Sequence, residues 1–370
     1  MNHPGNHQTG LRGLTVLLAL LIPLLLIAGF YGCGTEDPAV SEPSPEESSA
    51  GPESSAGPES EDRSEIALPS EPESTGPDLR SDGDALILDD YDDRFACRQL
   101  FAWSSERGLL MRKGERIELL YPASLTKLVT ALVALEYADP ETECVAGEEL
   151  DLVGKDASIA YIPRGSRATL SQLIEGMLLP SGCDASYVIA ANVGKILKPE
   201  TPTALTAVSV FVDAMNKWSK ENGLNHSNWM NPDGYHHDLH YTCMEDMLIV
   251  GTLCVRNEAI LRYTRTYQES VKLLSGEGNT WTNTNSYVNP SSPYYNPYCF
   301  GLKTGQTAEA GGCLLTAYQY GNEILLVGTF GSKTYNARFD VSKSVLDAVL
   351  HPDTEETPDG TSGEELSRAA

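Results

Sequence analysis

Apolar residues recur with two different periods along residues 83–351, and the change of period separates strand-like ends from a helical middle. Near the start, two short apolar runs flank a polar turn and predict a β-hairpin over residues 100–103 and 108–111. In the middle, apolar residues return every three or four positions, which is the spacing of one helix face. This spacing predicts helices over residues 124–137, 170–178, 184–196, 208–221 and 244–256.

The last part of this segment returns to strand-like runs and then closes with a helix. We expect strands over residues 298–303, 313–320 and 324–330, followed by a helix over 336–350. Strands at both ends with helices between them predict one sheet assembled from the two ends of the domain. That arrangement is an α+β fold rather than a series of alternating βαβ units.

The first 33 residues have the pattern of an export signal. One base, Arg12, precedes an apolar run over residues 14–31, and Gly32 and Cys33 follow it. A small residue before a cysteine resembles a bacterial lipobox, in which Cys33 would become a lipidated N-terminus. The run is also long enough to cross a hydrocarbon core of about 30 Å. A lipoprotein, a transmembrane signal-anchor and plain secretion therefore stay open, and all three place the remaining chain outside the cytoplasm.

The net charge of −26 is concentrated outside the predicted domain. Residues 34–82 are rich in Ser, Pro, Glu and Gly and carry 14 acids against two bases. Such a composition cannot offset the entropy lost on ordering, so we expect a disordered acidic linker. Residues 352–370, with six acids and one arginine, predict a disordered tail. The acidic balance also argues against nucleic acid as a partner, since both would be polyanions.

Three short motifs in the domain could carry chemistry together. Ser124 and Lys127 are one helical turn apart, so the lysine amine can reach the serine hydroxyl and take its proton. Ser181-Gly182-Cys183 follows the second helix. Lys303-Thr304-Gly305 ends the strand predicted from residue 298, and such residues at a strand edge suit the carboxylate of a peptide. Each motif alone is weak evidence for a catalytic site, because patterns this short recur by chance.

In this order, with gaps of 57 and 122 residues, the three motifs resemble the active-site serine penicillin-binding family. The chain is most similar to its low-molecular-mass D-alanyl-D-alanine carboxypeptidases, the S11 peptidases. The resemblance extends over about residues 97–350 and implies the penicillin-binding protein/β-lactamase-like fold, with an antiparallel sheet and a helical subdomain. It is carried by residues 121–128, 178–185, 231–234, 283–285 and 301–311.

The resemblance implies a serine-type carboxypeptidase that removes the terminal D-alanine of peptidoglycan pentapeptide stems, without metal or organic cofactor. Ser124 would be the nucleophile that forms the acyl-enzyme, Lys127 its general base, and Ser181 the relay of the proton to the leaving amine. β-Lactams would inhibit it. Lys303 would set the electrostatics of this proton relay, and Thr304 and Arg338 would bind the terminal carboxylate of the substrate. The backbone N–H groups of Ser124 and Gln306 would form the oxyanion hole. Gly305 and Cys183 are also implied as substrate-binding residues.

One position departs from the usual pattern of the family. Cys183 stands where most relatives have an asparagine, and a thiol is a much poorer hydrogen-bonding group than an amide. Two alternatives to the carboxypeptidase therefore stay open, a D-Ala-D-Ala transpeptidase and a relative that binds penicillin or peptidoglycan without turnover. A small buried contact is a better interpretation of Cys183 than a reactive thiolate.

Several other features have plainer interpretations. Glu221, with Leu224 and Asn225, matches a β-lactamase pattern, but we interpret it as a solvated acid at a helix end. The histidines of residues 236–240 offer metal ligands only in a loop, so we expect no metal site.

Arg338 could equally be a surface helix arginine. The six cysteines besides Cys33 and Cys183 could be free or paired. Many relatives carry a β-rich domain after the catalytic one, and we do not expect that domain here.

Overall fold

A computed structural model of the chain describes residues 79–89, 92 and 94–352. The predicted export signal with Cys33, nearly all of the acidic linker and the tail from residue 353 lie outside the described residues. Within the part that is described, no helix is both long and apolar enough to cross a membrane.

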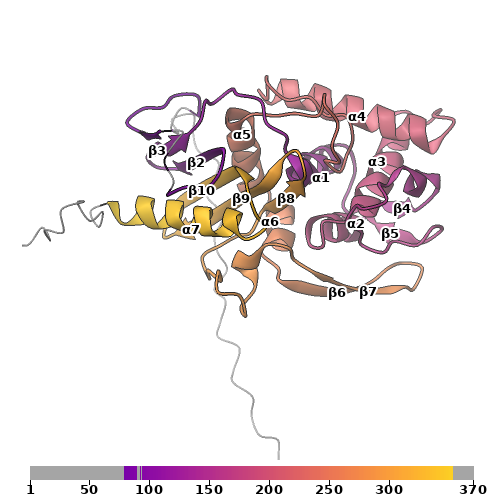
Figure 1. The fold of residues 1–370 in the computed structure, drawn as a ribbon. Helices are drawn as coiled ribbons and strands as arrows, with labels where there is room; N and C mark the ends of the chain where they lie inside the picture. The colour runs from indigo at the N-terminus through magenta and orange to yellow at the C-terminus, as the bar shows by residue number, and fades with distance from the viewer. Residues whose placement is uncertain (1–78, 90–91, 93, 353–370) are drawn as a thin grey trace, which may run out of the picture. The chain divides into compact units, whose positions relative to one another are not determined.

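The central sheet joins the two ends of the described chain, as predicted (Figure 1). Its strands lie in the order β1-β3-β2-β10-β9-β8. Every neighbouring pair is antiparallel, as expected, except the short edge strand β1, which pairs with β3 in parallel. The strands are β1 (Leu86–Leu88), β2 (Gln99–Ser104), β3 (Gly108–Lys113), β8 (Lys303–Thr307), β9 (Gly311–Tyr320) and β10 (Glu323–Ser332).

The parallel edge follows from how the chain enters the domain. Asp82 accepts from Arg112 of β3 at 2.9 and 3.1 Å and pairs with Arg116 at 3.2 Å, which holds the entering segment beside β3. Arg116 also donates to the Leu79 carbonyl. The end of the segment that we expect to be a linker, residues 79–82, therefore contacts the domain.

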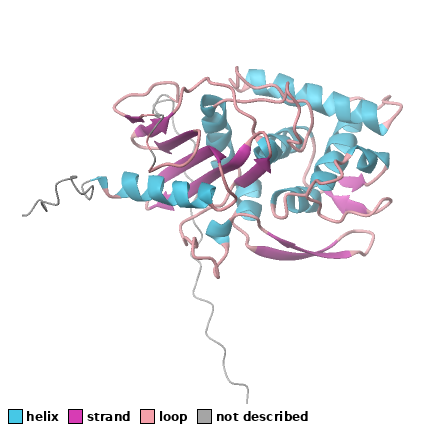
Figure 2. Ribbon diagram, viewed as in Figure 1, coloured by secondary structure: helices cyan, strands magenta, loops and turns pink. Residues whose placement is uncertain are grey.

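Alternate residues of the strands point to opposite faces of the sheet, and each face is covered by a helix (Figure 2). Leu100 and Ala102 of β2 pack in the core under α7 (Ala337–Leu350), whereas Phe101 and Trp103 pack in the core under α5 (Met244–Val255). The sheet is thus buried on both faces.

The middle of the chain forms a helical part beside the sheet, and all five helices predicted there are present. They are α1 (Thr126–Tyr137), α2 (Leu170–Leu178), α3 (Cys183–Leu197), α4 (Ala204–Glu221) and α5, with a shorter α6 (Glu258–Thr264). Helix α4 begins four residues earlier than predicted because the Thr203 side chain caps it, accepting from Thr206 N at 3.1 Å.

Short elements that the pattern did not predict complete the fold. Two small antiparallel pairs, β4 with β5 and β6 with β7, lie beside the helices, and three single turns of 3-10 helix lie between the longer elements. Their bounds are β4 (Glu143–Val145), β5 (Arg167–Thr169), β6 (Gln268–Lys272), β7 (Gly278–Thr282), η1 (Ala123–Leu125), η2 (Glu148–Leu152) and η3 (Ser286–Val288).

The strand predicted over residues 298–303 is wrong. Gly301 and Leu302 have left-handed backbone angles, with φ of +83° and +72°, and an extended strand cannot continue through them. Strand β8 begins at Lys303, where the predicted strand ended. The Lys-Thr-Gly motif therefore opens the edge strand instead of ending a strand, and its three residues are buried.

The seven cysteines of the described residues are all free and buried. The open question between free thiols and disulfides is thus answered for this part of the chain. They are Cys97, Cys144, Cys183, Cys243, Cys254, Cys299 and Cys313.

Candidate active site

The serine and lysine of the first motif lie in contact at the start of α1. Ser124 occupies η1, and the fully buried Lys127 donates from Nζ to Ser124 Oγ at 3.0 Å. The same amine contacts Cys183 Sγ at 3.3 Å and the Asp233 carbonyl oxygen at 2.7 Å. The amine therefore joins the first two motifs and a loop more than 100 residues away.

Unfavourable backbone angles gather at the three motifs. Only four residues other than glycine have a positive φ in the described chain. Three of them adjoin or belong to a motif, namely Ala123 (+49°), Ser181 (+64°) and Leu302 (+72°). Backbone strain of this kind persists where the surrounding structure holds it, and it is concentrated at functional sites.

A chain of hydrogen bonds holds the strained turn before Ser124. Thr126 Oγ1 donates to the Ala123 carbonyl at 2.8 Å and lies 2.8 Å from His240 Nε2. Met230 N donates to His240 Nδ1 at 3.1 Å, so the ring carries its proton on Nε2. Burial lowers the pKa of His240 to about 3. This histidine is a neutral support for the nucleophile's turn.

The Asn-Pro-Asp-Gly turn packs directly against the same carbonyl. Gly234 has a φ of +83°, and a Cβ added there would lie 1.8 Å from the Ala123 oxygen. Asn231 Oδ1 accepts from Gly234 N at 2.8 Å, and Thr130 Oγ1 donates to the Pro232 carbonyl at 2.6 Å. The turn thereby delivers the Asp233 carbonyl to Lys127.

The second motif is fixed by Ser158, a residue that sequence reasoning missed. Ser158 Oγ donates to the Ser181 carbonyl at 2.7 Å, and Cys183 N donates to the Ser158 carbonyl at 2.8 Å. Ser181 is 6% exposed, and its hydroxyl has no hydrogen-bond partner among the described residues. Because Ser158 precedes Ser181 by 23 residues, no local pattern could have linked the two.

Cys183 behaves as a small buried contact. It is 5% exposed, and burial raises the pKa of its thiol above the ordinary value even though Lys127 opposes that shift. A thiol with a raised pKa is a poor nucleophile because little thiolate is present.

The third motif brings a second buried amine to the site. Lys303 is 1% exposed, and burial, assisted by repulsion from Lys127, lowers its pKa well below the usual range. Its Nζ donates to the Thr304 carbonyl at 3.0 Å, while the Thr304 hydroxyl lies 2.6 Å from Thr284 Oγ1. A Cβ on Gly305 would lie 3.0 Å from Ser124 N, so β8 lies tightly against the nucleophile.

Arg338 is buried behind β8 rather than exposed on the surface of α7. It is 1% exposed, and its guanidinium donates to the Gly305 carbonyl at 2.7 Å and to Gln306 Oε1 at 3.1 Å. The carbon of the guanidinium lies 4.1 Å from the Tyr335 ring centroid. The structure brings Arg338 to the strand of the third motif, where it fixes the backbone.

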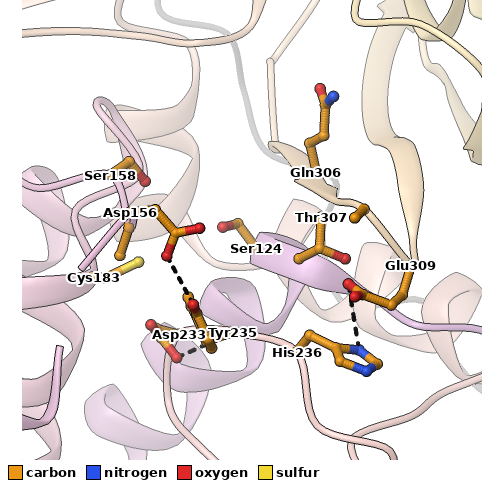
Figure 3. Close-up of a pocket in the computed structure, with 13 residues that line it drawn as sticks. Ser124, Asp156, Ser158, Cys183, Asp233, Tyr235, His236, Gln306, Thr307 and Glu309 are labelled. Atoms are coloured by element: carbon orange, nitrogen blue, oxygen red, sulfur yellow. Dashed lines mark hydrogen bonds and ion pairs between the residues drawn. The ribbon is translucent and has the colours of Figure 1, made fainter. Parts of the chain in front are cut away.

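A cavity of about 320 Å³ opens over Ser124 and Cys183 (Figure 3). Asp156 accepts from the Tyr235 hydroxyl at 2.7 Å, and His236 lies 3.8 Å from Glu309, as the dashed lines in Figure 3 mark. Gln306 and Thr307 of β8 form the opposite wall from Ser158. An extended peptide could add along β8 with its reacting carbonyl beside Ser124.

Glu221 takes no part in this cavity. It ends α4 and pairs with Lys217 at 3.7 Å, with more than half of its side chain exposed. The interpretation of Glu221 as a solvated acid at a helix end is therefore confirmed.

Comparison with known proteins agrees with this geometry. A model of the family Peptidase_S11, D-alanyl-D-alanine carboxypeptidase, matches residues 102–334. The chain belongs to this family. D-alanyl-D-alanine carboxypeptidase DacF of Bacillus subtilis is 28% identical over 235 residues, which cover 62% of this chain and 56% of that protein. A D-alanyl-D-alanine carboxypeptidase of Streptomyces sp. strain K15 is 26% identical over 224 residues, 58% and 74% of the two chains.

Solved structures show the same fold. The crystal structure of the Streptomyces K15 DD-transpeptidase has a TM-score of 0.62 at 24% identity, covering 69% of this S11 chain and 97% of that one. The carboxypeptidase DacD from Francisella tularensis has a TM-score of 0.58 at 21% identity, covering 69% and 70%. The predicted penicillin-binding protein fold is therefore confirmed.

The packing of Gly234 against the Ala123 carbonyl predicts an unusually costly substitution. Gly234→Ala should lower the free energy of unfolding by about 2–4 kcal/mol, because it adds a clash to a left-handed φ. Gly165→Ala is the matched control, since Gly165 has a φ of +84° with no atom within 4 Å of an added Cβ. It should cost about 1 kcal/mol. Urea denaturation measures both, and equal losses would contradict the packing argument.

The buried neutral His240 predicts a loss of stability in acid. Below its ordinary pKa of about 6.5 the unfolded chain binds a proton at this histidine, whereas the folded protein does so only near its lowered pKa of about 3. Stability should therefore fall as the pH drops between these values, by at most about 1.4 kcal/mol per pH unit from this group. Denaturation at several pH values should give a shallower dependence for His240→Gln. Exposed His351→Gln, away from the groups that act on His240, is the control and should match the wild type, whereas an unchanged slope in His240→Gln would refute the assignment.

Proposed function

We propose that this protein is a serine-type D-Ala-D-Ala carboxypeptidase that removes the terminal D-alanine from peptidoglycan stem peptides. The single observation that carries the proposal is the contact of 3.0 Å between the buried Lys127 amine and Ser124 Oγ beneath an open cavity. Membership in the S11 family supports the choice of substrate. Penicillin would be an inhibitor because it acylates the same serine.

The proposed reaction is acyl transfer through an ester of Ser124. Lys127 takes the proton from Ser124 Oγ as the oxygen attacks the carbonyl between the two D-alanines. The backbone N–H groups of Ser124 and Gln306 hold the oxyanion. The C–N bond then breaks, and the leaving amine receives its proton through Ser181. Water hydrolyses the ester in the second half of the reaction.

The remaining site residues would position the substrate. Thr304 binds the terminal carboxylate, and the low pKa of Lys303 lets this buried amine take part in the proton relay without a fixed charge. Gly305 lets the peptide-binding strand approach the nucleophile, while Arg338 holds that strand from behind. Cys183 contacts the Lys127 amine in place of an asparagine amide.

Transpeptidation is the second candidate, because the similar Streptomyces K15 structure is named a DD-transpeptidase. Both reactions share the acyl-enzyme and differ in whether water or an amine receives the acyl group. D-alanine release without a cross-linked product, with an amine acceptor present, would favour the carboxypeptidase. Penicillin binding with neither product would favour a non-hydrolysing binding protein.

We further propose that residues 83–351 are the catalytic domain and that it acts outside the cytoplasm. In this proposal residues 1–33 export the chain and anchor it at the outer face of the membrane, residues 34–82 form a linker, and residues 352–370 a tail. Labelled palmitate should be incorporated and should be lost in Cys33→Ala. Absence of label in the wild type would instead favour an uncleaved anchor or secretion.

The sharpest test of the proposed function is acylation by a fluorescent penicillin. The wild type should be labelled, and Ser124→Ala should not, because the ester forms on this oxygen. Lys127→Met should slow labelling by roughly 10²–10⁴-fold, the range of a general base. Cys183→Ala should still be labelled, since the thiol is only a contact. Undiminished label on Ser124→Ala would overturn the proposal.

A further inference from the structure

Tyr161 combines two features that are each unfavourable for the stability of the fold, an exposed aromatic ring and a left-handed backbone. Its side chain is exposed, with 73% of the residue accessible, and its φ is +60°. Glycine or asparagine tolerates a left-handed φ far better than a bulky aromatic residue does. No burial of the ring offsets this strain, so the fold alone gives no reason for an aromatic ring here.

The residues on both sides of Tyr161 are fixed by one buried carboxylate. Asp184, which is 5% exposed in the first turn of α3, accepts from Ala160 N at 2.7 Å and from Ile162 N at 3.0 Å. Trp281 Nε1 donates to the Ala160 carbonyl at 2.9 Å. With both neighbours held in this way, the backbone of Tyr161 cannot relax, and the ring is presented outward.

The same loop is locked onto the active site. A Cβ on Gly182 would lie 2.6 Å from Ala160 Cβ, so the loop touches the second motif without space between them. Three residues before Tyr161, Ser158 binds the Ser181 carbonyl and forms part of the cavity wall (Figure 3). Three residues span at most about 11 Å, so Tyr161 stands close outside the cavity.

We propose that Tyr161 is a contact for the saccharide chain to which the peptide substrate is attached. This inference rests on the proposed function, since only a peptide held in the cavity brings its polymer to this loop. A rigid tyrosine offers an apolar ring face and a hydroxyl with little loss of side-chain entropy. A pyranose ring has the complementary chemistry, with C–H groups on its face and hydroxyls at its edge. Short peptides would not reach Tyr161, whereas the polymer would.

The test compares two substrates that carry the same peptide. D-alanine release is measured from a soluble pentapeptide and from insoluble peptidoglycan with intact pentapeptide stems. Tyr161→Ala should lower kcat/KM on the polymer about tenfold and leave the soluble peptide unchanged, while Tyr161→Phe should retain most of the activity on the polymer. Tyr298→Ala, another exposed tyrosine at 55%, is the matched control and should affect neither substrate. Equal effects of Tyr161→Ala on both substrates would overturn the inference.

A binding measurement separates this inference from the proposed function. The Ser124→Ala protein, which cannot turn the substrate over, should co-sediment with insoluble peptidoglycan that carries intact pentapeptide stems, and the added Tyr161→Ala change should reduce the bound fraction. An unchanged fraction would overturn the saccharide contact and favour a protein partner for the ring. Absence of D-alanine release by the wild type would instead refute the proposed function. Tyr161→Gly, which relieves the strained φ, should unfold at no lower a temperature than the wild type, which keeps misfolding out of the comparison.

Discussion

The burial of one amine organises this protein. Lys127 is completely inaccessible, yet its Nζ has an acceptor on Ser124, a contact with Cys183 and a carbonyl from the Asp233 turn. An amine without such partners would be costly inside the fold, so these separate segments must meet in one arrangement. The left-handed Ala123 and Ser181 lie next to these contacts, because Ala123 precedes Ser124 and Ser181 stands two residues before Cys183.

The sheet contributes by placing a free edge where a substrate can pair with it. Strand β8 lies at the end of the order β1-β3-β2-β10-β9-β8 and packs through Gly305 against the turn of the nucleophile. Arg338 binds the strand from behind, through the Gly305 carbonyl. An edge strand would normally invite unspecific pairing, but here it is short and forms a wall of the cavity.

The spacing of apolar residues predicted the long helices and strands. It could not predict which residues far apart in the sequence come into contact in the folded protein. Helices α1, α2 and α3 repeat apolar residues at helical spacing, so their positions were clear. Strand β8 was misplaced because Gly301 and Leu302 look like the interior of a strand, whereas their left-handed angles depend on tertiary contacts. The hairpin of β6 and β7 was missed because its residues are mostly exposed and lack an apolar face. For the site, the motifs identified Ser124 and Lys127, but Ser158 and the Asp233 carbonyl act through distant or backbone contacts without a sequence signature.

The free thiols bear on how the molecule survives damage. All seven described cysteines are buried, and burial raises the pKa of each, so the folded protein offers an oxidant almost no thiolate. The domain can thus mature without waiting for disulfides to form. Unfolding exposes all seven thiols at once, and disulfides formed between wrong partners would then keep the chain unfolded. In an oxidising compartment its working lifetime would be governed by the rate of unfolding more than by its equilibrium stability.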